Sequence, residues 1–399
     1  DYFKLPAGID YLKVYSSLAQ VSNDLDPYST YLTYGKNLTY GSTPSVSYRD
    51  VLANPAILPE QSTAIEAGLA LSFLNNKVSA EATYYNVYDE FQIRDLAISE
   101  ASGFPLRKSN VLDFRTQGVE LMLNIYPIKN ENLSWDFSVN WSRQVKKFAA
   151  IHGSEKFGNY MVGDRADAYY ATIWQKSADG QVILNNATRM PIRDSYAKNV
   201  GHLDPNWRFG FQNRFNIHGF SLNLDIDGSV GGLINSVTHE KMWWGGKHPS
   251  STKYRDAEYT AGKYVYVPEG VIVTGGELVR DVNGKVVSDT RTYEKNTQAV
   301  SWQTWSQIYP YQARVTEDEN KFFANTFDRS FVKLRRLSVA YDINKFIKTS
   351  KVKSINATVF GYNLLMWQNI PFLDPDYGDD NNLQDPSARY IGASLNFKF

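Results

Sequence analysis

Asp225 and Asp227, separated by a single residue, are a pair of carboxylates that could act as acid and base on a glycosidic bond. They lie in residues 220–229, where apolar and polar side chains alternate, so both carboxylates project from one face of a strand. Burying that face without partners would cost several kcal/mol, so water must lie behind it. We therefore interpret the two aspartates as charges on a polar wall and expect no enzyme activity.

Arg336 is the expected partner of these aspartates, because it falls on the polar face of the next long strand, residues 331–342. Either the three charges form an ion pair that stiffens the wall, or they belong to a polar path for a solute. Lys333 and Arg335 fall on the opposite, apolar face. Register therefore predicts that these two cations pair with lipid phosphates.

Metal-binding patterns are weak. The five histidines have no HExxH or HxH spacing that would hold zinc, and the absence of cysteine removes thiolate ligands. Four acidic residues of the last loop are weak calcium candidates without the spacing of an EF-hand: Asp374, Asp376, Asp379 and Asp380. A solvated acidic loop is the preferred interpretation, and no cofactor is predicted.

Aromatic residues gather in the largest connection, residues 232–324, among many charged side chains. Flat rings beside carboxylates and amides suit sugars, which have an apolar face and polar edges, and such a surface also suits a protein partner. Packing of the loop itself, or contact with a partner, is favoured over direct substrate contact. The candidates are Trp243, Trp244, Tyr254, Tyr264, Tyr266, Trp302, Trp305 and Tyr309. Turns at residues 275–276 and 281–284 predict hairpins inside this loop.

A two-residue alternation of apolar and polar side chains recurs along the chain and predicts about ten strands. They are residues 11–22, 65–73, 78–88, 119–125, 133–142, 207–217, 220–229, 331–342, 354–367 and 388–399. The connections between them alternate in length. Short ones lie near residues 75, 127, 218 and 344, and long ones follow residues 22, 88, 147, 232 and 367. Such sidedness is typical of an outer-membrane β-barrel with periplasmic turns and extracellular loops, and it places Phe399 at the periplasmic rim.

Composition agrees with this fold. Net charge is zero, which argues against nucleic acid as a partner. No apolar run reaches the ~18 to 20 residues of a membrane-spanning helix, but a barrel strand exposes only alternate side chains to lipid. The aromatic share of 14% suits two membrane-interface girdles, although a large soluble β-sandwich could use the same rings in its core.

Several motifs resemble the SusC/RagA-like TonB-dependent transporters of the Gram-negative outer membrane. Residues 58–68, LPEQSTAIEAG, are similar to that family's Pro-Glu segment followed by an alternating Glu-x-Gly strand. Residues 331–341, FVKLRRLSVAY, resemble its late "FlrLrnitLgY" strand. Residues 361–367, GYNLLMW, match its G-x-N-L-x-x-W strand end, and Asp374-Pro375-Asp376 and the terminal aromatic strand follow in order.

The resemblance implies that residues 1–399 are the C-terminal part of a barrel of roughly 22 strands, with the plug domain and first strands outside this chain. It implies active import of a bulky nutrient, an oligosaccharide or alternatively a peptide, energised through TonB and assisted by a SusD-like surface lipoprotein. A contact with the plug is a further role for the charged wall. Outer-membrane lipid would surround the strands.

Two other functions remain open from the residues themselves. One is a stand-alone outer-membrane barrel that binds a surface ligand, or adheres, through its long loops. The other is a secreted all-β carbohydrate-binding protein. Extraction that requires detergent separates the second of these from the barrels, and an upstream plug in the same polypeptide separates the first from an importer.

Overall fold

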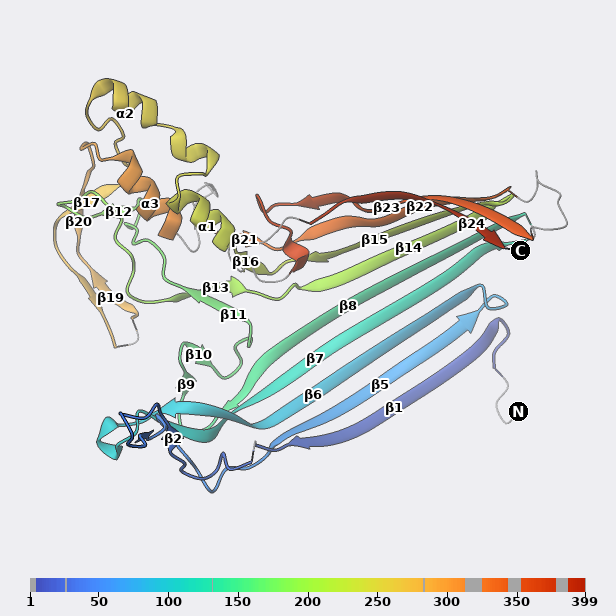
Figure 1. Ribbon diagram of the computed structural model, residues 1–399, viewed down its shortest axis with the longest axis horizontal. Coiled ribbons are helices and arrows are strands. Elements are labelled where there is room, and N and C mark those ends of the chain that lie inside the picture. Colours follow the sequence, from blue (N-terminus) through green and yellow to red (C-terminus); the bar gives the residue numbers. More distant parts are fainter. Residues whose placement is uncertain are drawn as a thin grey trace. The chain divides into compact units, whose positions relative to one another are not determined.

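The protein is described by a computed structural model, which covers residues 5–25, 27–130, 132–282, 284–312, 325–343, 353–377 and 387–398. The chain forms two compact units (Figure 1). Unit 1 comprises Asp1–Asp167 and Trp207–Asn223, and unit 2 comprises Ala168–Asn206 and Leu224–Phe399. Among the described residues, no helix has the length and apolar character needed to cross a membrane.

Unit 1 is built on a sheet of long antiparallel strands, in which each long strand pairs with the next long strand along the chain (Figure 1). In order they are β1 (Ile9–Asn23), β5 (Glu60–Phe73), β6 (Val78–Ala97), β7 (Leu106–Lys129), β8 (Leu133–Ile151) and β14 (Trp207–Ile217). The predicted strands all lie inside these ranges. The two-residue alternation located them because each strand has two faces in different surroundings.

Tyrosine rings lie across glycines on one face of this sheet. Tyr15 is paired directly with Gly68, and a Cβ at Gly68 would collide with the Tyr15 ring. The Tyr15 hydroxyl continues to the following strand, where it donates to Glu81 at 3.0 Å. Tyr85 lies over Gly118 in the same way, and a Cβ at Gly118 would collide with the Tyr85 ring. Each glycine therefore provides the space in which a ring lies flat and joins three strands.

The prediction of a long connection after residue 88 is wrong. β6 and β7 stay hydrogen-bonded as far as the pair Ala97 and Leu106, so the connection is only residues 98–105, with the short helix η1 (Glu100–Ser102). Alternation ends near Tyr88, whereas backbone pairing continues through a register shift beside Phe91, whose φ is 59°. Alternation reports two different surroundings, and hydrogen bonding between strands does not require them.

Short elements complete unit 1. They are β2 (Gly35–Lys36), β3 (Val46–Ser47), β4 (Val51–Leu52), β9 (Lys156–Phe157) and β10 (Tyr160–Met161). β2 pairs with β3, β9 pairs with β10, and β4 pairs in parallel with the start of β7. A small core of Val111, Leu112, Phe114 and Phe148 lies at this end of β7 and β8.

Unit 2 contains a second group of long strands, in the order β15 (Phe220–Val230, in this unit from Leu224), β22 (Phe331–Asp342), β23 (Ser354–Gln368) and β24 (Tyr390–Lys398). β23 pairs antiparallel with both β22 and β24. The bounds of β22 are those predicted from alternation. Most of the short connection predicted at residues 344–353, and Phe399, lie outside the described residues.

The remainder of unit 2 includes three helices that the sequence reading did not anticipate: α1 (Val237–Trp244), α2 (Arg255–Ala261) and α3 (Trp302–Gln312). A ribbon of β12 (Ile183–Leu184), β17 (Val271–Gly275) and β20 (Thr292–Lys295) accompanies them (Figure 1). The predicted hairpin at residues 281–284 is confirmed as β18 (Leu278–Arg280) with β19 (Val286–Asp289). These elements form what we call the loop module.

The other short elements of unit 2 are β11 (Ala168–Ala171), β13 (Lys198–His202), β16 (Leu233–Asn235), β21 (Thr326–Asp328), η2 (Pro249–Thr252) and η5 (Pro375–Tyr377). β11 pairs with β13, and β16 pairs with β21. The hydrogen bond from the Ser236 backbone N–H to the Asn325 carbonyl, at 2.6 Å, ties the start of α1 to the segment before β21. The two ends of the longest connection in the loop module, between β16 and β21, are thus held together.

Candidate functional site

A cluster of seven charged side chains joins β15, β22 and the segment that follows β23. Its members are Asp225, Asp227, Lys333, Arg335, Arg336, Asp374 and Asp376, here called the ion-pair cluster. Arg336 contacts Asp225 at 2.8 Å, as expected. Asp227 instead accepts from Arg335, whose Nε lies 2.5 Å away. Arg335 also reaches Asp376 at 2.6 Å.

The prediction that Lys333 and Arg335 meet lipid phosphates is wrong. Lys333 is buried and contacts Asp374 at 2.5 Å and Asp376 at 3.1 Å. The pairing of β22 with β23 shifts between Leu334 and Arg336, where β23 has one residue more than β22, beside Asn363, whose φ is 52°. Arg335 and Arg336 are consecutive in β22, yet each contacts an aspartate of β15. A register counted from alternation alone predicts neither the shift nor this pair of contacts.

The acidic segment after β23 is not the solvated loop that was expected. The side chains of Lys333 and Asp374 are 3% and 1% exposed, so this is a buried ion pair. Removing one member of such a pair leaves an uncompensated buried charge and costs about 3–5 kcal/mol. Asp376 is shared between Lys333 and Arg335, and the other two calcium candidates, Asp379 and Asp380, lie outside the described residues.

Most of the predicted aromatic candidates pack against one another in the loop module. Trp243, Trp302 and Trp305 are buried in its core with Leu184 and Val300. Tyr254, Tyr266 and Tyr309 are partly buried against that core, whereas Trp244 and Tyr264 are exposed. Packing of the loop therefore accounts for most of these rings.

One stack of rings crosses the core. Tyr309 lies between Trp174 and Trp305, with ring centroids 5.6 and 4.9 Å apart and both interplanar angles at 16°. The Arg193 guanidinium lies over the outer face of this stack, 5.3 Å from the Trp174 centroid. Stacked rings contribute about 0.5–1.5 kcal/mol each beyond their burial. Sequence reasoning missed Trp174 and Arg193 because they come from a different loop.

A cavity of about 880 Å³ opens against this core, and we call it the aromatic cavity. Its lining includes Tyr254, Tyr266 and Tyr309 together with four charged residues: Asp179, Lys253, Glu269 and Lys295. Burial first, and then neighbouring Tyr254, raise the pKa of Tyr266, so its hydroxyl stays protonated. The cavity can therefore hydrogen-bond a polar ligand, but the faces of Tyr309 are already covered by other rings.

A smaller cavity of about 390 Å³ lies between the end of α1, α2 and α3, and we call it the helix pocket. It shares Trp243 and Trp302 with the aromatic cavity. Its lining also includes Trp244, whose side chain is exposed, and the polar side chains of Arg255, Glu258, Gln303 and Gln307. A half-exposed indole beside mixed donors and acceptors is thus found here, with the Lys241 ammonium over its ring at 5.6 Å from the centroid.

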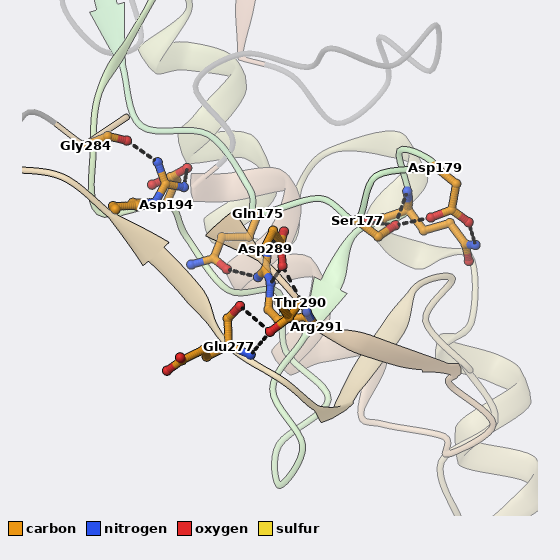
Figure 2. Close-up of polar contacts among 11 residues, drawn as sticks. Gln175, Ser177, Asp179, Asp194, Glu277, Gly284, Asp289, Thr290 and Arg291 are labelled. Atoms are coloured by element: carbon orange, nitrogen blue, oxygen red, sulfur yellow. Dashed lines mark hydrogen bonds and ion pairs between the residues drawn. The ribbon is translucent and has the colours of Figure 1, made fainter. Parts of the chain in front are cut away.

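Two sets of polar contacts lie close to the loop module (Figure 2), and Asp179 and Gln181 of the second set also line the aromatic cavity. Arg291 makes a two-pronged contact with Asp289, at 2.8 and 2.7 Å, and also donates to Gln175 at 3.0 Å. The hydrogen bond from Arg291 lowers the pKa of Asp289. Ser177 and Gln181 hold the Asp179 carboxylate at 2.6 and 2.7 Å, and these bonds lower its pKa.

Two histidines are buried behind the aromatic core. Burial first lowers the pKa of His239, and the same cause, followed by the neighbouring His239, lowers the pKa of His248 to about 4. His248 stacks on Trp243 with centroids 4.1 Å apart, and His239 contacts Asn325 Oδ1 at 2.7 Å. Both rings are therefore neutral packing groups near pH 7. Within the described ranges, no group of three or more His, Asp or Glu side chains is arranged to hold a metal ion.

Comparison with known proteins places these features in a family context. No protein-family model matches the chain. A curated protein, TonB-dependent receptor P3 of Formosa agariphila, is 21% identical over 393 residues, which cover 87% of this chain and 35% of that protein. TonB-dependent receptor P26 of the same organism is 26% identical over 101 residues, 25% of this chain and 10% of that protein.

Solved structures extend the match to nearly the whole chain. The structure described as the RagAB peptide transporter aligns with a TM-score of 0.66 at 17% identity, covering 98% of this chain and 41% of its own. The open-open state of the RagAB peptide importer aligns with a TM-score of 0.68 at 16% identity, covering 99% and 41%. The resemblance to TonB-dependent transporters of the SusC/RagA type is confirmed.

The fold is therefore part of an outer-membrane β-barrel, and the long strands of both units are barrel strands. The chain spans about a third to two fifths of the length of the TonB-dependent proteins it matches. These relatives are described as receptors and transporters and not as enzymes. In a barrel of this type, the ion-pair cluster belongs to the strands and the segment after β23, whereas both cavities belong to the loop module.

Proposed function

We propose that this chain is the C-terminal part of the barrel of an outer-membrane active importer, energised through TonB, that takes up a bulky nutrient. The observation that carries the proposal is the match of 98–99% of the chain to the RagAB barrel fold, together with the similarity to curated TonB-dependent receptors. Residues 1–399 then form one partial-barrel domain, and the plug and first strands belong to the rest of the polypeptide.

The proposed substrate is an oligosaccharide, with a peptide as the alternative. Support for a sugar comes from the exposed Trp244 beside amide, guanidinium and carboxylate groups in the helix pocket. Support for a peptide comes from the RagAB structures, which are described as a peptide transporter and a peptide importer. The proposed partner is a SusD-like surface lipoprotein, contacted by the long loops. The charged wall of Asp225, Asp227 and Arg336 is proposed to stiffen the barrel through its ion pairs, with a polar path or a contact with the plug as the alternative role.

The test is purification of the intact polypeptide from outer membranes, with intact mass, peptide mapping and identification of co-purifying proteins. An importer predicts a polypeptide about twice the mass of this chain or larger, plug peptides and a lipoprotein companion. A stable product of 45.4 kDa with neither would overturn the proposal. It would favour the alternative function, a stand-alone barrel that binds or adheres through its loops. Uptake should also stop when TonB is removed.

A further inference from the structure

We propose that the helix pocket binds one uncharged pyranose unit of an oligosaccharide. This inference rests on the proposed function of the protein as an importer and assigns a specific site in the loop module to the first contact with a glycan. The pocket volume, about 390 Å³, lies in the range of small-ligand sites, roughly 300–1,000 Å³, and suits a single sugar ring with its neighbours outside.

Trp244 supplies the apolar surface of the site. Its side chain is 56% exposed, whereas Trp243 and Trp302 of the same pocket are fully or almost fully buried. Trp244 is the last residue of α1, and the chain continues through Gly245 and Gly246. The backbone of Trp244 is held from the other side, because Gln307 donates to its carbonyl at 3.1 Å. The Lys241 ammonium lies over this ring, 5.6 Å from its centroid, and the exposed part of the anchored indole can stack on the C–H face of a sugar ring.

Four polar side chains line the same pocket as this indole, in two pairs with helical spacing. Arg255 and Glu258 are three residues apart on α2, and Gln303 and Gln307 are four apart on α3, so each pair lies on one helix face. Glu258 is oriented by accepting the Trp302 backbone N–H at 3.0 Å. Arg255 donates through one nitrogen to the Gly246 carbonyl at 2.7 Å and to Ser251 Oγ at 3.2 Å.

Gly246 makes the position of Arg255 possible. Its φ is 66°, and a Cβ there would lie 2.5 Å from the Arg255 terminal nitrogen. The guanidinium is therefore placed by its close approach to the backbone. It carries further N–H donors besides those in the two contacts given above. A side chain at position 246 would displace it.

The mixture of groups favours a neutral sugar over other ligands. Each sugar hydroxyl both donates and accepts, and the pocket offers donors on Arg255, acceptors on Glu258 and both on the two glutamines. The lining itself holds one positive and one negative side chain, and Lys241 lies beside it over Trp244, so Glu258 opposes a uronate or sulfated ring that the two cations would attract. An extended peptide is recognised mainly by main-chain pairing with a sheet edge, and the pocket is made of three helix ends.

Binding should be measured on the intact protein that contains this chain, by isothermal titration calorimetry in detergent. The probes are hexasaccharides of glucose, galactose and mannose, a hexasaccharide containing uronic acid, and peptides of similar length. The variants are Trp244→Ala and Gln303→Ala, with Tyr259→Ala as the matched control because Tyr259 is exposed on α2 and does not line the pocket.

We expect at least one neutral hexasaccharide to bind, Trp244→Ala to weaken it about tenfold or more, and Gln303→Ala to weaken it by a smaller factor, while Tyr259→Ala binds as the unaltered protein does. Absence of binding by all three neutral glycans, or equal binding by Trp244→Ala, would overturn the inference. A Trp244-dependent response to peptides alone would also overturn it.

The outcome is separable from the proposed function. TonB-dependent uptake of peptides by a protein that binds no neutral glycan would reject the helix pocket as a sugar site and leave the importer intact. Glycan binding that depends on Trp244, in a polypeptide without a plug and without TonB-dependent uptake, would reject import and retain the site.

Discussion

The strands of unit 1 and the loop module of unit 2 are stable for different reasons. The strands pair with neighbours in sequence and leave large apolar side chains such as Val14 and Leu18 exposed, which suits lipid. The loop module has little backbone pairing but buries Trp243, Trp302 and Trp305 in a conventional core. A barrel wall is thus specified by its backbone ladder and its surroundings, and the loop module by contacts between distant side chains.

The ion-pair cluster combines features of the barrel wall and of the loop module. It uses strand positions, as the wall does, but it depends on residues far apart in sequence, as the core of the loop module does. Lys333 and Asp374 are separated by 41 residues and are as buried as the tryptophans. Predictions that remove one contact of each kind should therefore separate these three sources of stability.

Lys333→Met should have the largest effect, because it leaves Asp374 buried without a counter-charge, at a cost of about 3–5 kcal/mol. We expect early hydrogen exchange in residues 368–377 and a lower melting temperature of the intact protein. The double variant Lys333→Met with Asp374→Asn should recover part of the loss. Unchanged exchange in that segment would show that the pair is not a principal support.

Trp305→Ala should cost about 3–5 kcal/mol within the loop module, through the lost ring and the cavity that it leaves. Because the strands pair through their backbone, their hydrogen-exchange protection should not change. Exchange of α3 and of residues 171–194 reports the module. Tyr264→Ala is the control, since that ring is exposed in the same module. Loss of protection in β5–β7 would contradict the separation of wall and module.

Gly68→Ala should cost about 1–3 kcal/mol, because the new methyl group collides with the Tyr15 ring and the strands are already closely packed. The loss should appear as weaker protection of β1 and β5. Combining it with Tyr15→Ala should relieve the clash and recover most of the protection. If the double variant is no better than Gly68→Ala, the ring is not the cause.

Acidification should have a smaller effect that is confined to the loop module. His248, with a folded pKa of about 4, and His239, whose pKa is also lowered, take up protons in the unfolded chain near their ordinary value of about 6.5. Stability is therefore complete above about pH 6.5 and decreases as the pH falls toward 4. Near-UV circular dichroism of the melting transition measures it.

Replacing both buried histidines with glutamine should remove that pH dependence, whereas His218→Gln, at the exposed turn between β14 and β15, should leave it. A pH dependence that survives the double substitution would assign the titration to other groups.

Strand positions were readable from sequence where the two faces differ. Residues 331–342 were predicted with the bounds that the structure has, because the wall imposes a two-residue alternation there. The same signal stopped at Tyr88 although β6 continues to Ala97, since pairing persists without a contrast between faces. The three helices were not predicted from the sequence, because short helices packed on aromatic side chains carry no clean three-to-four-residue pattern.

The sequence by itself determined the class of fold, the approximate strands, the pairing of Arg336 with Asp225 and the concentration of aromatic residues in one long connection. Those features depend on periodicity and composition, which are local properties. Tertiary structure alone decided that Arg335 pairs with Asp227, that Lys333 is buried with Asp374, and that Trp244 stays exposed while Trp243 is buried. Each of these depends on which distant segment packs against the residue, and a one-residue shift or a neighbouring helix reverses it.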